Sequence, residues 1–235
     1  MRTKNFIATV FLLAVTASSW AARPFVTDDA RLTTAGSCQL ESWVRVYRAS
    51  SEVWALPACN PTGNFELTLG QGRAYYDAAG REPADDYIFQ VKTLFRKLET
   101  NSYGYGIAAG TVRHPAISPG PNLFGNNYVY FPYSASFADD KLVMHLNAGW
   151  LKERGTEKNR ATWGVGTEWN VNERVTWLVE AFGESNPHSY WQAGGRFSLI
   201  PHLLQIDTTV GRATGANRDN RWISLGLRFT PASLF

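Results

Sequence analysis

The chain has 235 residues, with 23 basic and 20 acidic side chains, 20 glycines, 13 phenylalanines, 10 tyrosines and 9 tryptophans. This nearly balanced charge argues against nucleic acid as a partner, which would call for a basic surface. No segment approaches 18 consecutive apolar residues, which argues against a transmembrane helix. The abundance of glycine and aromatic residues favours strands, and aromatic residues also form the girdles of membrane-spanning barrels.

Residues 1–21 predict a secretory signal peptide. Arg2 and Lys4 give it a basic start, residues 6–15 form a short apolar stretch, and small residues precede the end at Ala21. The alternative, a membrane anchor, is disfavoured because about ten apolar residues are too few to span a bilayer as a helix. We therefore expect export through the periplasm and cleavage after Ala21.

Cys38 and Cys59 are the only two cysteines. One opens and the other closes a pair of neighbouring strand-like runs, and a tight polar turn at residues 48–51 lies between them. A hairpin folded at this turn places the cysteines roughly opposite each other, in a compartment where disulfides persist. We predict a disulfide at the periplasmic end of this hairpin; two thiols alone do not favour a metal or redox site.

Twelve strand-like runs follow an extended lead over residues 23–37. Most are about 8–12 residues long, which suits a tilted strand that crosses a bilayer. Turn-forming residues separate them. The predicted strands are 38–47, 52–59, 64–73, 87–98, 102–113, 127–137, 142–153, 160–169, 175–183, 189–199, 203–212 and 221–230.

The connections between these runs alternate between tight turns and longer loops. Short periplasmic turns and longer outer loops are typical of outer-membrane barrels, and an even strand count places both termini in the periplasm. The tight turns lie at 60–63, 99–101, 138–141, 170–173 and 200–202, and the loops at 74–86, 114–126, 154–159 and 213–220.

Alternating strands are compatible with a membrane barrel or with a soluble two-sheet sandwich. One face of the run 160–169 begins with Trp163 and ends with Trp169, as expected for a strand that meets two membrane interfaces. The last run alternates over residues 223–229, and the chain ends in Phe235. We therefore predict an all-β, closed antiparallel barrel of about twelve strands, with Phe235 as the signal for the barrel-assembly machinery.

The opposite face of the runs carries charges that would line the lumen: the acids Glu41, Glu66, Glu168, Glu180 and Asp207 and the bases Arg45, Lys92, Arg96, Arg196 and Arg228. Two interpretations stay open, a salt-bridged filling of a narrow lumen and an eyelet that orients a polar solute. A twelve-stranded lumen lies between a filled eight-stranded barrel and an open porin. The candidate eyelet residues are Glu66, Lys92, Arg96, Glu180, Arg196, Asp207 and Arg228.

The sequence gives little support for an enzyme. His145 shares a strand face with the asparagine two residues on, as in some outer-membrane lipases, but no serine lies two residues from it. His188 and Ser189 would point to opposite faces, whereas a nucleophile needs its base within hydrogen-bond reach. The scattered histidines predict no metal site, and no cofactor is expected. Acid pairs such as Asp28 and Asp29 are compatible with calcium, but solvated loop pairs are commoner.

Five stretches, taken in chain order, carry a resemblance. They are RPFVTDD at 23–29 (followed by Gly36 and Glu41), NFELTLG at 64–70, VKTLFR at 91–96, WLVEAFGE at 177–184 and LQID at 204–207. Together they resemble a family of Gram-negative outer-membrane proteins labelled by the meta-cleavage pathway of phenol degradation, or as transporters. The resemblance implies a barrel that passes small molecules, aromatic compounds among them, and no catalytic residues. The cysteine pair departs from that family's pattern.

These patterns together predict one outer-membrane barrel over residues 22–235 that lets small solutes pass passively. The alternatives are a non-conducting envelope barrel and a lipid-modifying outer-membrane enzyme. The expected partners are outer-membrane lipid, the assembly machinery and small solutes. Lipopolysaccharide phosphates are further expected at the basic residues Arg212, Arg218 and Arg221.

Overall fold

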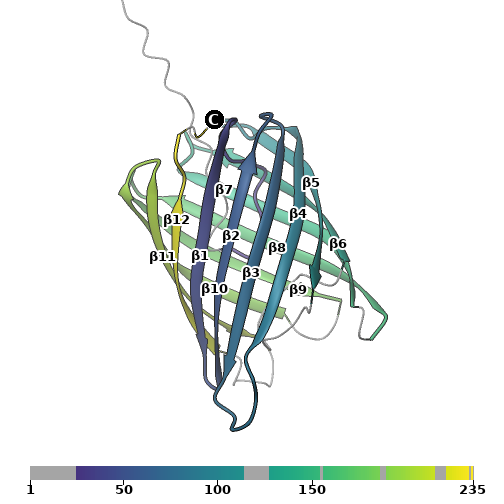
Figure 1. Cartoon of the computed structure of the whole chain (residues 1–235). Coiled ribbons are helices and arrows are strands. Elements are labelled where there is room, and N and C mark those ends of the chain that lie inside the picture. The colour runs from purple at the N-terminus through teal and green to yellow at the C-terminus, as the bar shows by residue number, and fades with distance from the viewer. Residues whose placement is uncertain are drawn as a thin grey trace, which may run out of the picture.

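The computed structural model describes residues 25–113, 127–153, 156–185, 189–214, 221–232 and 234. The predicted signal peptide and Phe235 lie outside the described residues. Within the described part the chain forms one closed barrel in which each strand pairs with its sequence neighbours and β12 pairs with β1 (Figure 1). None of the described segments is a helix long and apolar enough to cross a membrane.

All neighbouring strands pair antiparallel, so the predicted fold class is confirmed. The strands are β1 Ser37–Tyr47, β2 Ser50–Asn60, β3 Phe65–Tyr76, β4 Ala84–Arg96, β5 Tyr103–Arg113, β6 Asn127–Phe137, β7 Leu142–Glu153, β8 Lys158–Asn170, β9 Val175–Glu184, β10 Ser189–Ile200, β11 Leu204–Ala213 and β12 Arg221–Phe229.

The connection between β3 and β4 is shorter than the sequence predicted. The strands continue to Tyr76 and from Ala84, because cross-strand pairs such as Gly72 with Asp86 and Ala74 with Ala84 extend the ladder. Ala74 and Asp86 are fully buried, so the inward-facing alternation persists beyond the expected strand ends. The connection is therefore limited to residues 77–83.

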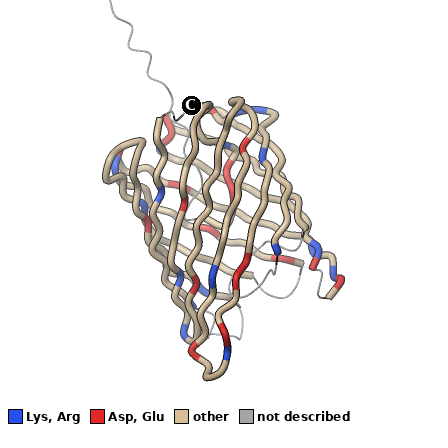
Figure 2. Tube along the Cα trace, viewed as in Figure 1, with Lys and Arg blue, Asp and Glu red and all other residues tan. Residues whose placement is uncertain are grey.

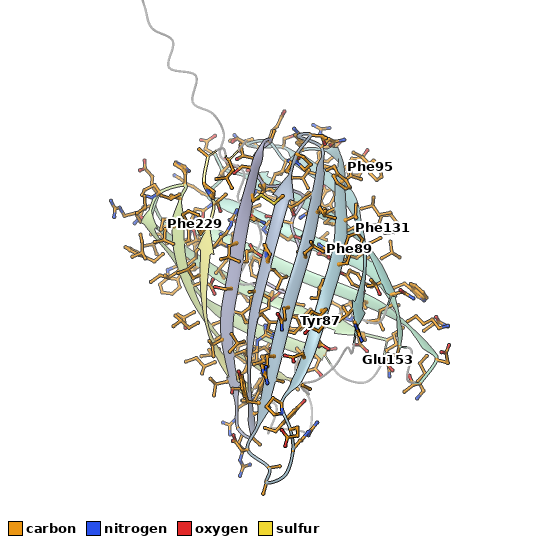
Figure 3. All side chains as sticks on the ribbon, in the orientation of Figure 1. Tyr87, Phe89, Phe95, Phe131, Glu153 and Phe229 are labelled. Atoms are coloured by element: carbon orange, nitrogen blue, oxygen red, sulfur yellow. A yellow bond between two sulfur atoms is a disulfide. The ribbon has the colours of Figure 1, made fainter. Side chains whose placement is uncertain are left out.

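Side chains alternate between the inside and the outside of the barrel, but with the polarity inverted relative to a soluble protein. In β12, Ser224 is buried, whereas Ile223 and Leu225 are 54% and 63% exposed. Figure 3 shows Tyr87, Phe89 and Phe131 projecting from the outer face, and all three are exposed. A continuous apolar exterior suits hydrocarbon rather than water, which excludes the sandwich interpretation.

The first strand begins and the last strand ends at the same end of the barrel (Figure 1). The Leu234 N–H donates to the Gly36 carbonyl at 3.0 Å, which ties the C-terminal segment to the chain just before β1. At the same end Cys38 and Cys59 face each other across β1 and β2 and form a disulfide, as predicted. We call this end the terminus end and the opposite one the loop end.

Candidate functional site

The interior of the barrel is the candidate site, because its wall carries the charged side chains. Figure 2 shows acidic and basic positions along the strands as well as in the turns. Six of the seven predicted eyelet residues are buried inside, each with at most 4% of its surface exposed: Glu66, Lys92, Glu180, Arg196, Asp207 and Arg228.

The seventh, Arg96, was wrongly predicted to face the lumen. The register between β4 and β5 shifts between Leu94 and Arg96, so counting alternate residues fails there. Arg96 is exposed; its guanidinium donates to Ser102 Oγ at 3.0 Å and lies 3.9 Å from the ring centre of Tyr103. It belongs to the outer surface near the terminus end.

Residues 25–36 form what we call the lumen segment: residues 25–33 lie inside the barrel, and the exposed Thr34 and Ala35 lead to β1. The sequence predicted an extended lead here but not its place in the lumen. Thr27, Asp29 and Ala30 are fully buried, and Thr33 is 2% exposed. The polar wall therefore encloses a stretch of the protein's own chain.

Lys92 on β4 binds the two adjacent acids of this segment. Its Nζ lies 2.8 Å from Asp28 Oδ1 and 3.5 Å from Asp29 Oδ1. The Tyr130 hydroxyl on β6 donates to Asp28 Oδ2 at 2.7 Å, and Asn147 Nδ2 donates to the Asp28 carbonyl at 3.2 Å. This pair, for which the sequence left solvation or calcium open, is bound by side chains of the wall, because a buried carboxylate needs a cation or several donors.

Glu180 on β9 binds the main chain of the segment. Its two carboxylate oxygens accept the N–H groups of Val26 and Thr27 at 2.8 and 2.9 Å. Gln192 on β10 donates to the same carboxylate. The wall is also shaped for this contact, since a Cβ added at Gly164 would lie 2.4 Å from Thr27 Oγ1.

Glu66 on β3 and Asn60 on β2 hold the other end of the segment. Glu66 Oε2 accepts the Thr33 N–H at 2.7 Å, and Asn60 Nδ2 donates to the Thr33 carbonyl at 2.6 Å. Leu32 and Ala30 pack on Leu94 of β4 in a small apolar cluster. Charged and apolar contacts together fix the segment just before it becomes β1.

Glu168 on β8 bridges two arginines. Its carboxylate lies 3.1 Å from Arg196 of the wall and 3.4 Å from Arg31 of the lumen segment. Burial alone would lower the pKa of Arg31, but the carboxylates of Glu168 and Asp29 outweigh it and raise this pKa. Arg31 is therefore a permanent cation in the lumen.

Ser134 and His145 form a pair that sequence spacing did not reveal, because they lie opposite each other on β6 and β7. Ser134 Oγ lies 2.8 Å from His145 Nδ1, and His145 Nε2 lies 3.8 Å from Glu168 Oε1. Both residues are fully buried, and the Ser134 hydroxyl accepts the Ala30 N–H at 2.9 Å. The pair binds the lumen segment, and its hydroxyl is covered by that segment rather than open to a substrate.

Apolar and aromatic side chains form a layer inside the loop end, and this layer also contains the buried ion pair between Arg45 and Glu52 at 3.1 Å. Trp43 and Trp54 stack with ring centres 5.7 Å apart, and Tyr128 stacks on Tyr130 at 6.1 Å. The Tyr130 ring belongs to this layer while its hydroxyl binds Asp28, so the layer meets the charged region there. The buried members are Tyr47, Trp54, Ile88, Val112, Tyr128, Leu151, Phe182 and Trp222.

The remaining predicted charges stay at the wall. Arg228 Nε lies 3.8 Å from Glu41 across the β1–β12 seam, and Arg228 also donates to Gln39 Oε1 at 3.1 Å. Asp207 faces Arg196 in the β10–β11 register. Within the described residues, no group of three or more His, Cys, Asp or Glu side chains is placed to hold a metal ion.

Comparison with known families gives one match over most of the chain. A family described as "Uncharacterised conserved protein UCP029691" matches residues 9–230. The chain belongs to this family. No curated protein sequence matches it.

The fold of this chain is that of solved outer-membrane channels. The KdgM porin superposes with a TM-score of 0.62 at 8% identity, covering 82% of this chain and 99% of that porin. The NanC porin gives 0.57 at 10% identity, with 83% and 100% covered. The COG4313 outer membrane channel from Pseudomonas putida F1 gives 0.55 at 11% identity, with 86% and 97% covered. At these identities the likeness establishes the architecture.

Proposed function

We propose that the protein is an outer-membrane channel for the passive passage of small solutes, and that the lumen segment occupies its path at rest. The porin architecture and the apolar outer surface support insertion in a membrane. A closed barrel leaves no unpaired strand edge in hydrocarbon, which is the condition for spanning it with strands.

The observation that carries this proposal is that an extended piece of chain fits inside the wall. A path that holds a polypeptide with its side chains has the cross-section that a small solute needs once the segment leaves. The segment is held by hydrogen bonds, ion pairs and small apolar contacts, and it continues into β1 only at Gly36. Withdrawal of the segment breaks no hydrogen bond between paired strands.

The second candidate is a non-conducting envelope barrel. The near-complete burial of the lumen charges favours it, because a permanently filled interior needs the same satisfied groups. The two candidates differ in whether weakening the segment's contacts opens a path. Aromatic solutes remain part of the first proposal, since the layer around Trp43 and Trp54 offers ring faces to such compounds.

The test is conductance in planar bilayers of the wild type and of a variant with Asp28→Ala, Asp29→Ala and Arg31→Ala, which we call the released variant. All three substitutions lie in the segment and leave the wall intact. The control is Thr34→Ala, at an exposed position of the same segment. We expect far higher conductance from the released variant than from the wild type or the control.

A released variant that is folded yet conducts no better than the wild type would overturn the channel proposal and favour the envelope barrel. Folding is checked by the mobility shift on boiling that resistant barrels show on gels. Gly164→Val offers a second route to the same state from the wall side, because its side chain would displace Thr27. Agreement between the two variants excludes an effect peculiar to one of them.

We also propose that basic side chains at the loop end contact lipopolysaccharide phosphates. Arg212 and Arg221 are exposed and pair across β11 and β12, while Arg218 lies outside the described residues. Guanidinium groups bind phosphate through paired, charge-assisted hydrogen bonds. If replacing all three arginines by alanine leaves lipopolysaccharide association unchanged, this part of the proposal fails.

A further inference from the structure

The wall of the lumen contacts the main chain of its occupant at several points along its length. Four N–H groups of the lumen segment, those of Val26, Thr27, Ala30 and Thr33, donate to wall side chains. Two carbonyl groups of the segment accept hydrogen bonds from Asn60 and Asn147. These are groups that every peptide carries, whatever its side chains.

The wall also binds an acidic and a basic side chain of the segment, each at a different place. Asp28 is bound by Lys92 and by the Tyr130 hydroxyl, while Arg31 is bound by Glu168. The wall groups that make these ionic contacts are buried to the same degree as a protein core, with Lys92 and Glu168 each 2% exposed. The arrangement therefore recognises an acidic and a basic group on one extended chain.

We infer that the lumen is a binding site for short extended peptides, and that residues 25–33 are its built-in occupant. This inference rests on the proposed channel function and names its solute class: peptides and related zwitterions with N–H donors. Once the segment leaves, the carboxylates of Glu66 and Glu180 lose their main-chain donors. Water that enters the open path hydrates these carboxylates, and a solute with N–H donors at the same positions can replace that water and restore the hydrogen bonds.

Other small solutes match these groups less well. The Glu180 carboxylate accepts two consecutive main-chain N–H groups. A hydrocarbon supplies no such donors, and a neutral sugar supplies hydroxyl donors but no charged groups for Lys92 and Glu168. A simple organic anion would pair with Lys92 but would not replace the N–H groups that the segment donates to Glu66 and Glu180. A simple cation would pair with the acids of the wall but would not replace the carboxylates that the segment offers to Lys92. A peptide meets both demands at once.

The experiment uses a synthetic peptide with the sequence of residues 25–33, FVTDDARLT, added to the released variant in planar bilayers. We expect it to abolish the added conductance in a saturable manner. A matched peptide with asparagine in place of both aspartates should block about tenfold less tightly or worse, because it lacks the charge-assisted bonds to Lys92. Tryptophan fluorescence of the detergent-solubilised variant, to which Trp43 and Trp54 inside the barrel contribute, measures binding without any need for conduction.

Liposome swelling with dipeptides, tripeptides and sugars of similar mass supplies the solute comparison. We expect the peptides to enter faster through the released variant. Conductance without peptide block, binding or preferred peptide entry would overturn the peptide inference while leaving the channel proposal standing. Peptide binding seen by fluorescence in a variant that does not conduct would overturn the channel proposal and leave the binding site.

Discussion

Replacing Lys92 by methionine tests how the lumen segment is held. The Lys92 ammonium is 2% exposed and lies 2.8 Å from Asp28 Oδ1 and 3.5 Å from Asp29 Oδ1. Methionine keeps an unbranched side chain that is one atom shorter and removes the charge. Asp28 is then left in the lumen without its cation, close to the carboxylate of Glu66, which faces Lys92 across β3 and β4.

The magnitude follows from the burial of this pair. Removing one partner of a buried ion pair costs about 3–5 kcal/mol. Each 1.4 kcal/mol changes an equilibrium constant about tenfold. The equilibrium constant for binding of the segment inside the barrel should therefore fall by a factor of roughly 100 or more. The loss falls on the segment because the Lys92 side chain takes no part in the strand ladders.

The assay is the frequency of open events in planar bilayers, and we expect Lys92→Met to open far more often than the wild type. The matched control is Lys97→Met, which removes the same charge from an exposed position just beyond β4. A folded Lys92→Met protein that opens no more often than the Lys97→Met control would refute the reasoning that the segment is seated by this ion pair.

Three further outcomes are expected. Arg96→Ala should leave ion selectivity unchanged, because this side chain lies outside the barrel; a measured shift in reversal potential would contradict its placement. Reducing the Cys38–Cys59 disulfide should lower the temperature of the gel-mobility transition by an amount equivalent to about 3 kcal/mol at most, with no effect on a Cys38→Ser, Cys59→Ser variant. Leu225→Arg, on the outer face, should cost about 2–4 kcal/mol of folding stability in lipid vesicles, whereas Val171→Arg in a turn should cost little.

Alternation along single strands was enough to predict the wall. Within each strand, alternate residues face the lumen and the exterior, so the positions of Glu66, Lys92 and Glu180 follow from the strand's own sequence. The same rule failed at Arg96, because a shift in register adds a residue that no local pattern announces. The disulfide was predictable for the same reason as the wall, since a hairpin is a local structure.

The occupant of the lumen was not predictable in this way. Asp28 meets Lys92 only because the wall has closed, and Thr27 meets Glu180 at a separation of 153 residues. Without these partners, two adjacent acids before a strand are indistinguishable from a solvated loop. The sequence did show a polar wall with as many acids as bases. This balance indicated that the charges have partners, but it did not indicate that residues 25–36 supply them.

The position of residues 25–36 also constrains the order in which the molecule is built. Their partners lie on strands from β2 to β9, so their binding site forms only when most of the barrel has assembled. This stretch, which precedes the first strand in the sequence, is consequently expected to bind among the last. We therefore expect a newly closed barrel to have an open interior until residues 25–36 bind to its wall.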